Sequence, residues 1–307
     1  MSSEKCDFCK NTAALTKYDL GAHRIVKCQG CGLMRLSPMP TLDDTKQVYA
    51  DISYFQNPGF YEVAKGNLYG YVDYIAERMN KLRGYRPIAE FLYKRHGSQV
   101  AGLPRILDVG CGLGYFLDVA QDVGFGVTGI EFNPGAIRQM KEKYAFPVYE
   151  GSLHSIPASA GQFDVITMFD VIEHLHDPFG DMKKMFELLQ PGGGVAITTM
   201  DSESFSSRLL GMRLEDFRRI REHLYFFSRE SLTKVLESAG FRVYAIKSYG
   251  HTFELGFLLE RMQIINRPIF GAARWLVEQL GMARWRVSIN PHTKMIVYAQ
   301  KPIAAPR

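Results

Sequence analysis

This 307-residue sequence contains no run of eighteen apolar residues free of charge, and so it predicts no helix that spans a bilayer. The first ten residues, MSSEKCDFCK, lack the basic stretch and the apolar stretch of a signal peptide. Cysteine is scarce, with five in the chain. Together these absences predict a cytoplasmic protein, soluble or peripheral to the membrane, whose thiols stay reduced.

The overall composition is that of a globular protein, with 46% apolar and 22% charged residues. The length suits one α/β domain with a small accessory module and a cap. A formal charge of +5 is too small to require nucleic acid, but residues 242–307 hold ten Lys or Arg against three Glu. We therefore expect any anionic partner at the C-terminal end.

Residues 1–40 carry two C-x2-C pairs separated by eighteen residues, the spacing of a four-thiolate zinc ribbon. Glycines in CQGCGL allow the backbone to curl around an ion. Four protein ligands leave no open position, so the predicted zinc is structural. The alternatives, unrelated free thiols or a redox pair, are disfavoured by this spacing and by the lack of a surrounding βαβ pattern. The predicted ligands are Cys6, Cys9, Cys28 and Cys31.

Residues 41–98 follow the Pro-bounded SPMPT and have helical character. We expect a helical linker whose aromatic residues mostly pack, with one or two near Tyr54 closing over a ligand as a lid. These aromatic residues are Tyr49, Tyr54, Phe55, Tyr61, Tyr69, Tyr71 and Tyr74.

Residues 99–250 alternate short apolar runs with helical stretches, and residues 294–307 add a last strand and a tail. This rhythm predicts an α/β sheet covered on both faces, with its ligand at the carboxyl ends of the strands. The first strand leads into ILDVGCGLG, but Tyr115 replaces the sixth-position glycine of a dinucleotide fingerprint. Glu131 ends the second strand, where it can bind ribose hydroxyls. No Lys or Arg flanks the turn, so an adenosine with an uncharged or cationic group is favoured.

At these motifs the sequence resembles the class I S-adenosylmethionine-dependent methyltransferases. The resemblance covers roughly residues 100–250 and includes DVGCGLG, IEFNP, FDVITMFDVIEHLHDP and LLQPGGGVAITT in that order. It implies a Rossmann-like, seven-stranded methyltransferase sheet with helices on both faces.

The resemblance also implies a set of cofactor-binding residues. The glycine turn would approach the methionine part, Glu131 the ribose and Phe132 the adenine, while Phe169 and Asp170 would border the methyl group. Many relatives have Asp where this chain has Ser152, and that Asp accepts a hydrogen bond from the adenine amino group. In this chain a hydroxyl or a backbone group must accept it instead. The implied residues are Asp108, Gly110, Cys111, Gly112, Gly114, Glu131, Phe132, Ser152, Leu153, Phe169 and Asp170.

Two histidines are candidates for the general base of methyl transfer to a hydroxyl, His174 and His223. The alternative for His174 is packing at a helix start. No Asn-Pro-Pro-Tyr motif follows the fourth strand, which favours an oxygen or carbon acceptor over a planar nitrogen. Asp170, Glu173 and His174 form D-x-x-E-H, similar to the E-x-x-E-H metal site of quinone-biosynthesis O-methyltransferases. A magnesium site is a disfavoured alternative, because Asp has a shorter arm than Glu.

The predicted function is methyl transfer to a small sugar, phenolic or lipid-like molecule. One alternative is a zinc-ribbon RNA methyltransferase, because residues 1–40 hold six Lys or Arg against three acids. The arrangement of cysteines before L-x-x-S-P-x-P is more similar to zinc-bearing methyltransferases of sugar and secondary-metabolite pathways. Another alternative is a non-catalytic, cofactor-binding scaffold, which the intact glycine turn and Glu131 disfavour.

Residues 251–293 form an insertion with apolar residues at helical spacing and arginines between them. One interpretation is a helical cap over the active site. The other is an amphipathic surface that handles a lipid-like substrate or contacts an anionic membrane.

Overall fold

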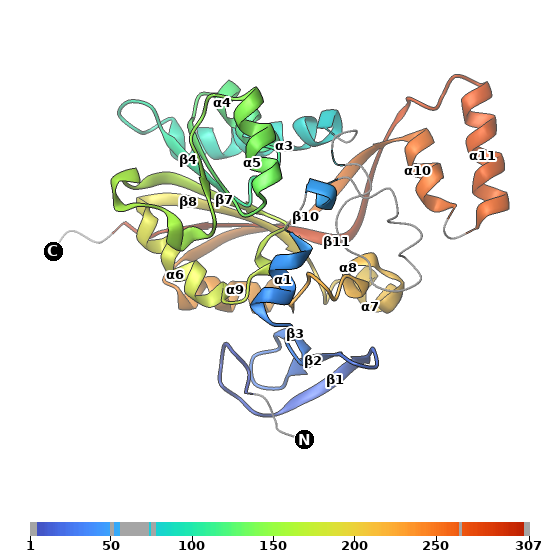
Figure 1. Ribbon diagram of the computed structural model, residues 1–307, viewed down its shortest axis with the longest axis horizontal. Helices are drawn as coiled ribbons and strands as arrows, with labels where there is room; N and C mark the ends of the chain where they lie inside the picture. The colour runs from blue at the N-terminus through green and yellow to red at the C-terminus, as the bar shows by residue number, and fades with distance from the viewer. Residues whose placement is uncertain (1–4, 50–51, 56–73, 75–77, 264–265, 304–307) are drawn as a thin grey trace.

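A computed structural model describes residues 5–49, 52–55, 74, 78–263 and 266–303 (Figure 1). Its central sheet has seven strands in the order β10-β11-β8-β7-β4-β5-β6. The five strands from β8 to β6 run parallel, and β11 is antiparallel to both of its neighbours. This confirms the predicted Rossmann-like sheet. The strands are β4 (Arg105–Val109), β5 (Gly126–Glu131), β6 (Val148–Glu150), β7 (Phe163–Phe169), β8 (Leu189–Met200), β10 (Arg242–Glu254) and β11 (Arg286–Gln300).

Helices cover both faces of this sheet, because neighbouring strand residues point to opposite sides. In β4, Ile106 belongs to the apolar cluster with α3, α4 and α5, and Leu107 to the cluster with α6 and α9. Burial on both faces explains why the central strands β4, β5 and β7 are mainly apolar. The helices are α3 (Arg78–Leu92), α4 (Tyr115–Val123), α5 (Pro134–Lys143), α6 (Pro178–Leu188) and α9 (Arg229–Ser238).

The strand order reverses beside β4, with β5 and β6 on one side and β7 and β8 on the other. Loops leaving the carboxyl ends of β4 and β7 therefore diverge and open a crevice. Short elements surround this edge of the sheet. They are α1 (Leu42–Val48), the 3-10 turns Ile52–Phe55, Leu153–Ser155, Ile172–His174 and Gly211–Arg213, α7 (Phe205–Leu210) and α8 (Glu215–Arg218). The 3-10 turn Ala158–Ala160 lies at the opposite edge, where the Arg105 guanidinium at the start of β4 donates to the Ala160 carbonyl.

The predicted helical linker contains α1, the turn Ile52–Phe55, α3 and a π-helical turn at Tyr93–Gly97. The hydroxyl of Thr41 and the carboxylate of Asp44 form a capping box that starts α1. The predicted packing or lid residues Tyr61, Tyr69 and Tyr71 lie outside the described residues.

The N-terminal module is a second sheet, in the order β1-β2-β3-β9. Its four cysteines gather at one end, with Cys6 Sγ 3.6 Å from Cys31 Sγ and Cys9 Sγ 3.5 Å from Cys28 Sγ. Sulfurs bound to one tetrahedral zinc at about 2.3 Å lie roughly 3.8 Å apart. The cluster can therefore hold zinc, as the spacing predicts. The strands are β1 (Ala14–Asp19), β2 (Arg24–Cys28), β3 (Met34–Ser37) and β9 (Tyr225–Phe226).

This module is joined to the main domain through β9, which belongs to the chain after β8. Arg35 of β3 pairs with Tyr225 of β9. The Tyr225 hydroxyl donates to Asp7, which lies between the first two cysteines, at 3.1 Å. The Phe8 ring stacks on that of Phe179 in α6 at 5.4 Å. The metal cluster thus shares its packing with the main domain.

The insertion forms two helices at the end of the β10–β11 ribbon, α10 (Leu255–Met262) and α11 (Arg267–Gln279). Figure 1 shows them projecting to one side of the main domain. No helix in the described part of the chain has the length and apolarity needed to cross a membrane.

We expect one zinc ion per chain on the four cysteines. Replacing Cys6 and Cys28 together by Ser should remove it and lower Tm by roughly 10 °C, since a ribbon without its own core depends on the metal for several kcal/mol. Elemental analysis and thermal melts measure both effects. Cys111→Ser is the matched control, because this buried thiol lies outside the cluster and its loss should leave the zinc content unchanged. A full equivalent of zinc in the double variant would contradict this assignment.

Candidate functional site

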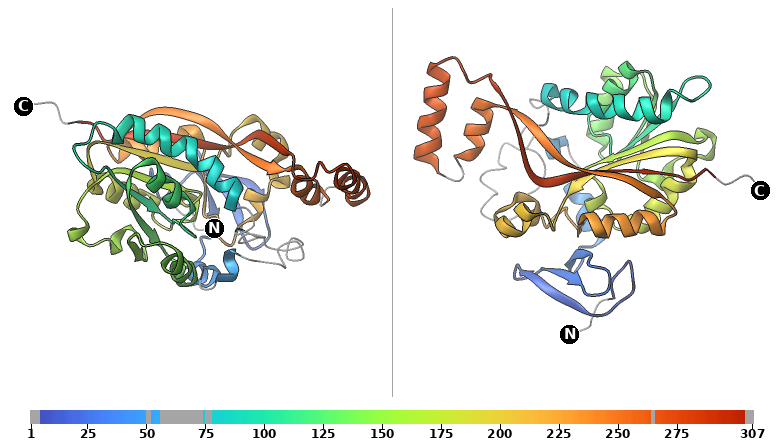
Figure 2. Two further views of the ribbon diagram at one scale, coloured as in Figure 1. Left: turned by 90° about the horizontal axis from the view of Figure 1, so that it is seen from above. Right: turned by 180° about the vertical axis from the view of Figure 1, so that it is seen from behind.

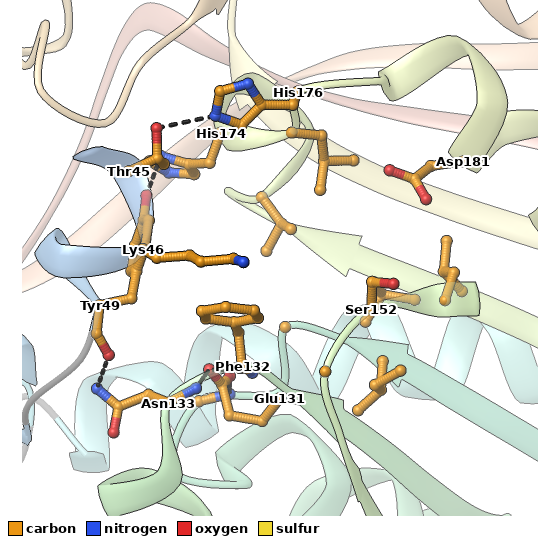
Figure 3. Close-up of a pocket in the computed structure, with 18 of the residues that line it drawn as sticks. Thr45, Lys46, Tyr49, Glu131, Phe132, Asn133, Ser152, His174, His176 and Asp181 are labelled. Carbon is orange, nitrogen blue, oxygen red and sulfur yellow. Dashed lines mark hydrogen bonds between the residues drawn. The ribbon is translucent and has the colours of Figure 1, made fainter. Parts of the chain in front are cut away.

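A cavity of about 580 Å³ lies at the carboxyl ends of β4, β5, β6 and β7 (Figure 3). The strand ends supply one wall, and α1 with the turn Ile52–Phe55 supplies the other. Most of the lining is apolar, so the cavity suits a ligand with planar or apolar parts. Its aromatic side chains are Tyr49, Tyr54, Phe55, Tyr74, Phe132 and Phe169.

The glycine turn after β4 presents backbone to this cavity. Gly110 and Gly112 line it, and both have left-handed backbones, with φ of 69° and 55°. A Cβ on Gly110 would lie 2.5 Å from the Val171 side chain. Glycine is therefore needed at position 110 for the turn to pack against Val171 in this left-handed conformation.

Two other residues of the turn face inward. Cys111 is buried, with its Sγ 3.8 Å from Met140 Sδ, and Gly114 begins α4 where a Cβ would crowd Met140 and Phe146. Neither lies among the lining residues of the cavity. The structure therefore gives them packing roles beneath the turn.

Asp108 also lies beneath the turn and does not line the cavity. Its carboxyl accepts a hydrogen bond from the Thr167 hydroxyl at 2.7 Å. Burial raises its pKa to about 8, and the charge of Glu131 adds to this shift. The group is thus mainly protonated at neutral pH.

Glu131 ends β5 and lines the cavity. Its carboxylate accepts backbone N–H groups from Gly112 at 2.7 Å and from Phe132 and Asn133 at 2.8 Å. Burial raises the pKa of this carboxyl, and the three hydrogen bonds oppose that shift. A carboxylate has about four lone-pair positions, so acceptor capacity remains for a ligand hydroxyl.

The loop after Glu131 connects the cavity wall to α1. Phe132 lines the cavity and is 42% exposed, so its ring is available to a ligand. Asn133 caps α5 through its side-chain oxygen and donates through Nδ2 to the Tyr49 carbonyl at 2.9 Å. Figure 3 shows this bond and the Lys46 side chain extended across the cavity near Phe132.

Ser152 and Leu153 line the cavity beyond β6. Two polar side chains that the sequence did not indicate lie beside them. His154 Nε2 is 3.4 Å from an Asp181 carboxyl oxygen, and burial raises the Asp181 pKa to about 6. Asp181 reaches the cavity from α6, and no local pattern marks a helix residue for that role.

Phe169 and Asp170 line the cavity at the end of β7. The Phe169 ring stacks on Tyr85 at 5.4 Å. Asp170 has a left-handed backbone, with φ of 55°, and its carboxylate forms an ion pair with Lys294 at 3.1 Å. A non-glycine residue in this conformation is strained and is typical of functional sites.

His174 borders the cavity, and the hydrogen bonds of its ring decide its tautomer. Nδ1 lies 2.9 Å from the Glu222 carbonyl oxygen and 2.9 Å from the Tyr49 hydroxyl oxygen. Because a carbonyl oxygen only accepts, the proton lies on Nδ1 and Nε2 keeps its lone pair. Burial lowers the pKa of His174, so the ring is neutral at neutral pH.

His223 packs behind His174, with ring centroids 4.8 Å apart, and does not line the cavity. Burial lowers its pKa well below the ordinary value, and the charge of His174 adds to this effect. Both predicted histidines are thus brought together, but only His174 reaches a ligand position.

The described residues bring Glu173, His174 and His223 within metal-binding distance of one another, with ligand atoms no more than 4.8 Å apart. Glu173 Oε2 and His223 Nδ1 are buried without a hydrogen-bond partner. Asp170 is not a member of this group. Two nitrogen donors do not suit magnesium, which prefers oxygen ligands, so the magnesium site suggested by D-x-x-E-H is not supported.

Residues 73–246 match a family model described as a methyltransferase domain, which covers more than half of the chain. A probable S-adenosylmethionine-dependent methyltransferase of Mycolicibacterium smegmatis is 31% identical over 155 residues, or 50% of this chain and 58% of that protein. A mitochondrial ubiquinone biosynthesis O-methyltransferase of Schizosaccharomyces pombe is 28% identical over 215 residues, or 66% of this chain and 70% of that protein. The matched regions thus span 58% to 70% of these relatives.

Among solved structures, a plantazolicin methyltransferase in complex with SAH has a TM-score of 0.51 at 15% identity. The match covers 84% of this chain and 96% of that one. This likeness agrees with the fold described above.

Proposed function

Because the chain belongs to the S-adenosylmethionine-dependent methyltransferases, we propose that it methylates an oxygen of a small, largely apolar molecule. One observation carries the proposal: a single aromatic cavity is bordered by the Glu131 carboxylate and by the neutral imidazole of His174. The first suits the cofactor, and the second suits an acceptor that must lose a proton.

The residues of the cavity fit S-adenosylmethionine, which supplies an activated methyl group when bound. Glu131 retains acceptor capacity for ribose hydroxyls, and Phe132 offers a partly exposed ring for the adenine. Gly110 and Gly112 let the backbone approach the methionine part. Asp181 supplies a carboxyl beside Ser152, where the amino group of adenine needs an acceptor.

His174 acts as the general base in this proposal. Its Nε2 would accept the proton of the acceptor hydroxyl, and bound S-adenosylmethionine would supply the methyl group to that oxygen and leave as the neutral thioether. The Glu222 carbonyl and the Tyr49 hydroxyl hold the ring at Nδ1. His223 is a positioning residue, since its ring contacts that of His174 but does not line the cavity.

An oxygen acceptor is supported by the fission-yeast relative, which is named for O-methylation in ubiquinone biosynthesis. The aromatic lining favours a phenolic or lipid-like molecule over a sugar. An RNA acceptor is less well supported, because two ribbon cations are already paired: Lys27 with Glu203 at 3.1 Å and Arg35 with Asp7 at 3.8 Å.

The acceptor class is tested with S-adenosylmethionine labelled in its methyl group and a fractionated extract. We expect label in a small, apolar molecule that extracts into organic solvent, and no label in RNA. The same incubation with Glu131→Ala protein is the control for background labelling. Label that becomes soluble only after ribonuclease treatment would contradict the small-molecule acceptor.

Glu131→Ala should weaken S-adenosylmethionine binding by about 1.5 to 3 kcal/mol, the range for charge-assisted hydrogen bonds. Part of this loss comes from the glycine turn, which the carboxylate also holds. Calorimetry measures the affinity, and NAD should not bind. Glu150→Ala is the matched control, because Glu150 pairs with Glu131 in the register of β5 and β6 but is exposed outside the cavity. Tighter binding of NAD than of S-adenosylmethionine would overturn the assignment.

His174→Ala should lower turnover about 10²- to 10⁴-fold while the cofactor affinity stays nearly constant. In the wild type, turnover should fall as the pH drops through the lowered pKa of His174, below about 6.5, because protonation removes the lone pair. His174→Ala should lack this acidic limb.

Two variants serve as controls for the His174 experiment. His292→Ala removes an exposed imidazole that does not line the cavity and should turn over normally. His223→Gln should shift the acidic limb and lower turnover less than His174→Ala does. Normal turnover in His174→Ala would place acid–base catalysis elsewhere.

A further inference from the structure

The helical pair at the end of the β10–β11 ribbon is separate from the cavity. Strand β11 pairs with β8 only over residues 294–300, and beyond them β10 and β11 continue as a two-stranded ribbon to Glu254 and Arg286. Figure 2 shows the two helices projecting from the main domain in both views. None of the described residues lining the cavity comes from 251–293, so these helices form no cap over it.

One face of α11 is apolar and exposed. The helix has no buried residue. Ile269, Leu276 and Leu280 are 61%, 52% and 62% exposed. They are spaced by seven and then four residues, which places their side chains on the same side of the helix axis. Trp275 and Trp285 nearby are 62% and 59% exposed. Such a concentration of exposed apolar side chains marks an interaction surface.

The same helical pair is basic. Between Leu255 and Val287 there are five arginines and two glutamates, Glu260 and Glu278. Both glutamates form ion pairs with one arginine, Arg274, at 3.2 and 2.8 Å. Among the described residues, three further arginines form no ion pair within 4.0 Å, although Glu254 lies opposite one of them, Arg286, in the register of β10 and β11. They are Arg267, Arg284 and Arg286.

We propose that this helical pair docks on the surface of a membrane that contains anionic lipids. Tryptophan rings favour the boundary between headgroups and acyl chains, and arginines bind the anionic headgroups. A second copy of the chain suits this surface less well. Pairing two copies of it would bring unpaired arginines together without acids to complement them.

The sequence provides a direct probe of docking, because its only two tryptophans are Trp275 and Trp285. Adding phosphatidylcholine vesicles with about one-third phosphatidylglycerol to the full chain should shift tryptophan emission to shorter wavelength. Pure phosphatidylcholine vesicles should bind at least tenfold more weakly, and high salt should weaken binding to the anionic vesicles. No emission shift with anionic vesicles would overturn the proposal.

Variants measured by co-sedimentation with the same vesicles separate the two contributions. Trp275→Ser with Trp285→Ser, and separately Arg284→Gln with Arg286→Gln, should each reduce binding at least tenfold. The matched control is Leu103→Ser with Phe205→Ser, which removes side chains 67% and 82% exposed elsewhere on the domain. Each variant should retain its zinc and the wild-type melting temperature.

Two outcomes would overturn membrane docking. In the first, the control pair reduces vesicle binding as much as the tryptophan pair does. In the second, the wild type dimerises in solution, the tryptophan pair abolishes the dimer, and vesicles have no effect. This test needs no methyl acceptor, so its result is independent of the proposed function.

Discussion

The floor of the site depends on the backbone of Leu224, which hydrogen-bonds to two distant segments. Its N–H donates to the carbonyl oxygen of Glu173 at 2.8 Å, and its own carbonyl oxygen accepts from the N–H of Leu36 at 2.9 Å. Glu173 precedes His174, Leu36 belongs to the cysteine-bearing sheet, and His223 precedes Leu224 itself. A displacement of the N-terminal module would therefore move both histidines. The four-cysteine cluster lies outside the cavity, but this backbone connects its sheet to the floor of the site.

The fold was predictable because its signals are local and repeated. Strands buried on both faces are continuous apolar runs, as in the ILDV sequence that ends at Val109, and each is followed by a helix with its own start and end signals. Pairs of cysteines at fixed spacing are also a local signal, because a two-residue spacer lets both sulfurs of one turn bind the same ion. Glu131 could be identified as a candidate site residue because it ends a strand, and the carboxyl ends of parallel strands form the ligand-binding edge of the sheet.

The details of the site were not predictable, because they depend on contacts between residues far apart in sequence. Nothing local distinguishes His174, which reaches the cavity, from His223, which packs behind it. The Tyr49 hydroxyl forms a hydrogen bond with the His174 ring, which lies 125 residues further along the chain. Asp181 reaches the cavity from a position within α6. The position of the insertion 251–293 was not predictable either, because the same amphipathic spacing is expected of a cap over the site and of a projecting helical pair.

The ionisable groups beneath the cavity are kept uncharged, which bears on how the site can accept a proton. Burial raises the pKa of Glu173 to about 8 and lowers those of His174 and His223. With the rings only 4.8 Å apart, two imidazolium ions would repel each other by about 3 kcal/mol at an effective dielectric constant near 20. The two rings can therefore hold no more than one added proton between them. A proton that His174 takes from an acceptor would raise the charge of the site by one, and the site would return to neutral only when His174 releases that proton to solvent. A buried, initially neutral floor thus gains one charge during the reaction, and the lowered pKa of His174 favours release of the proton afterwards.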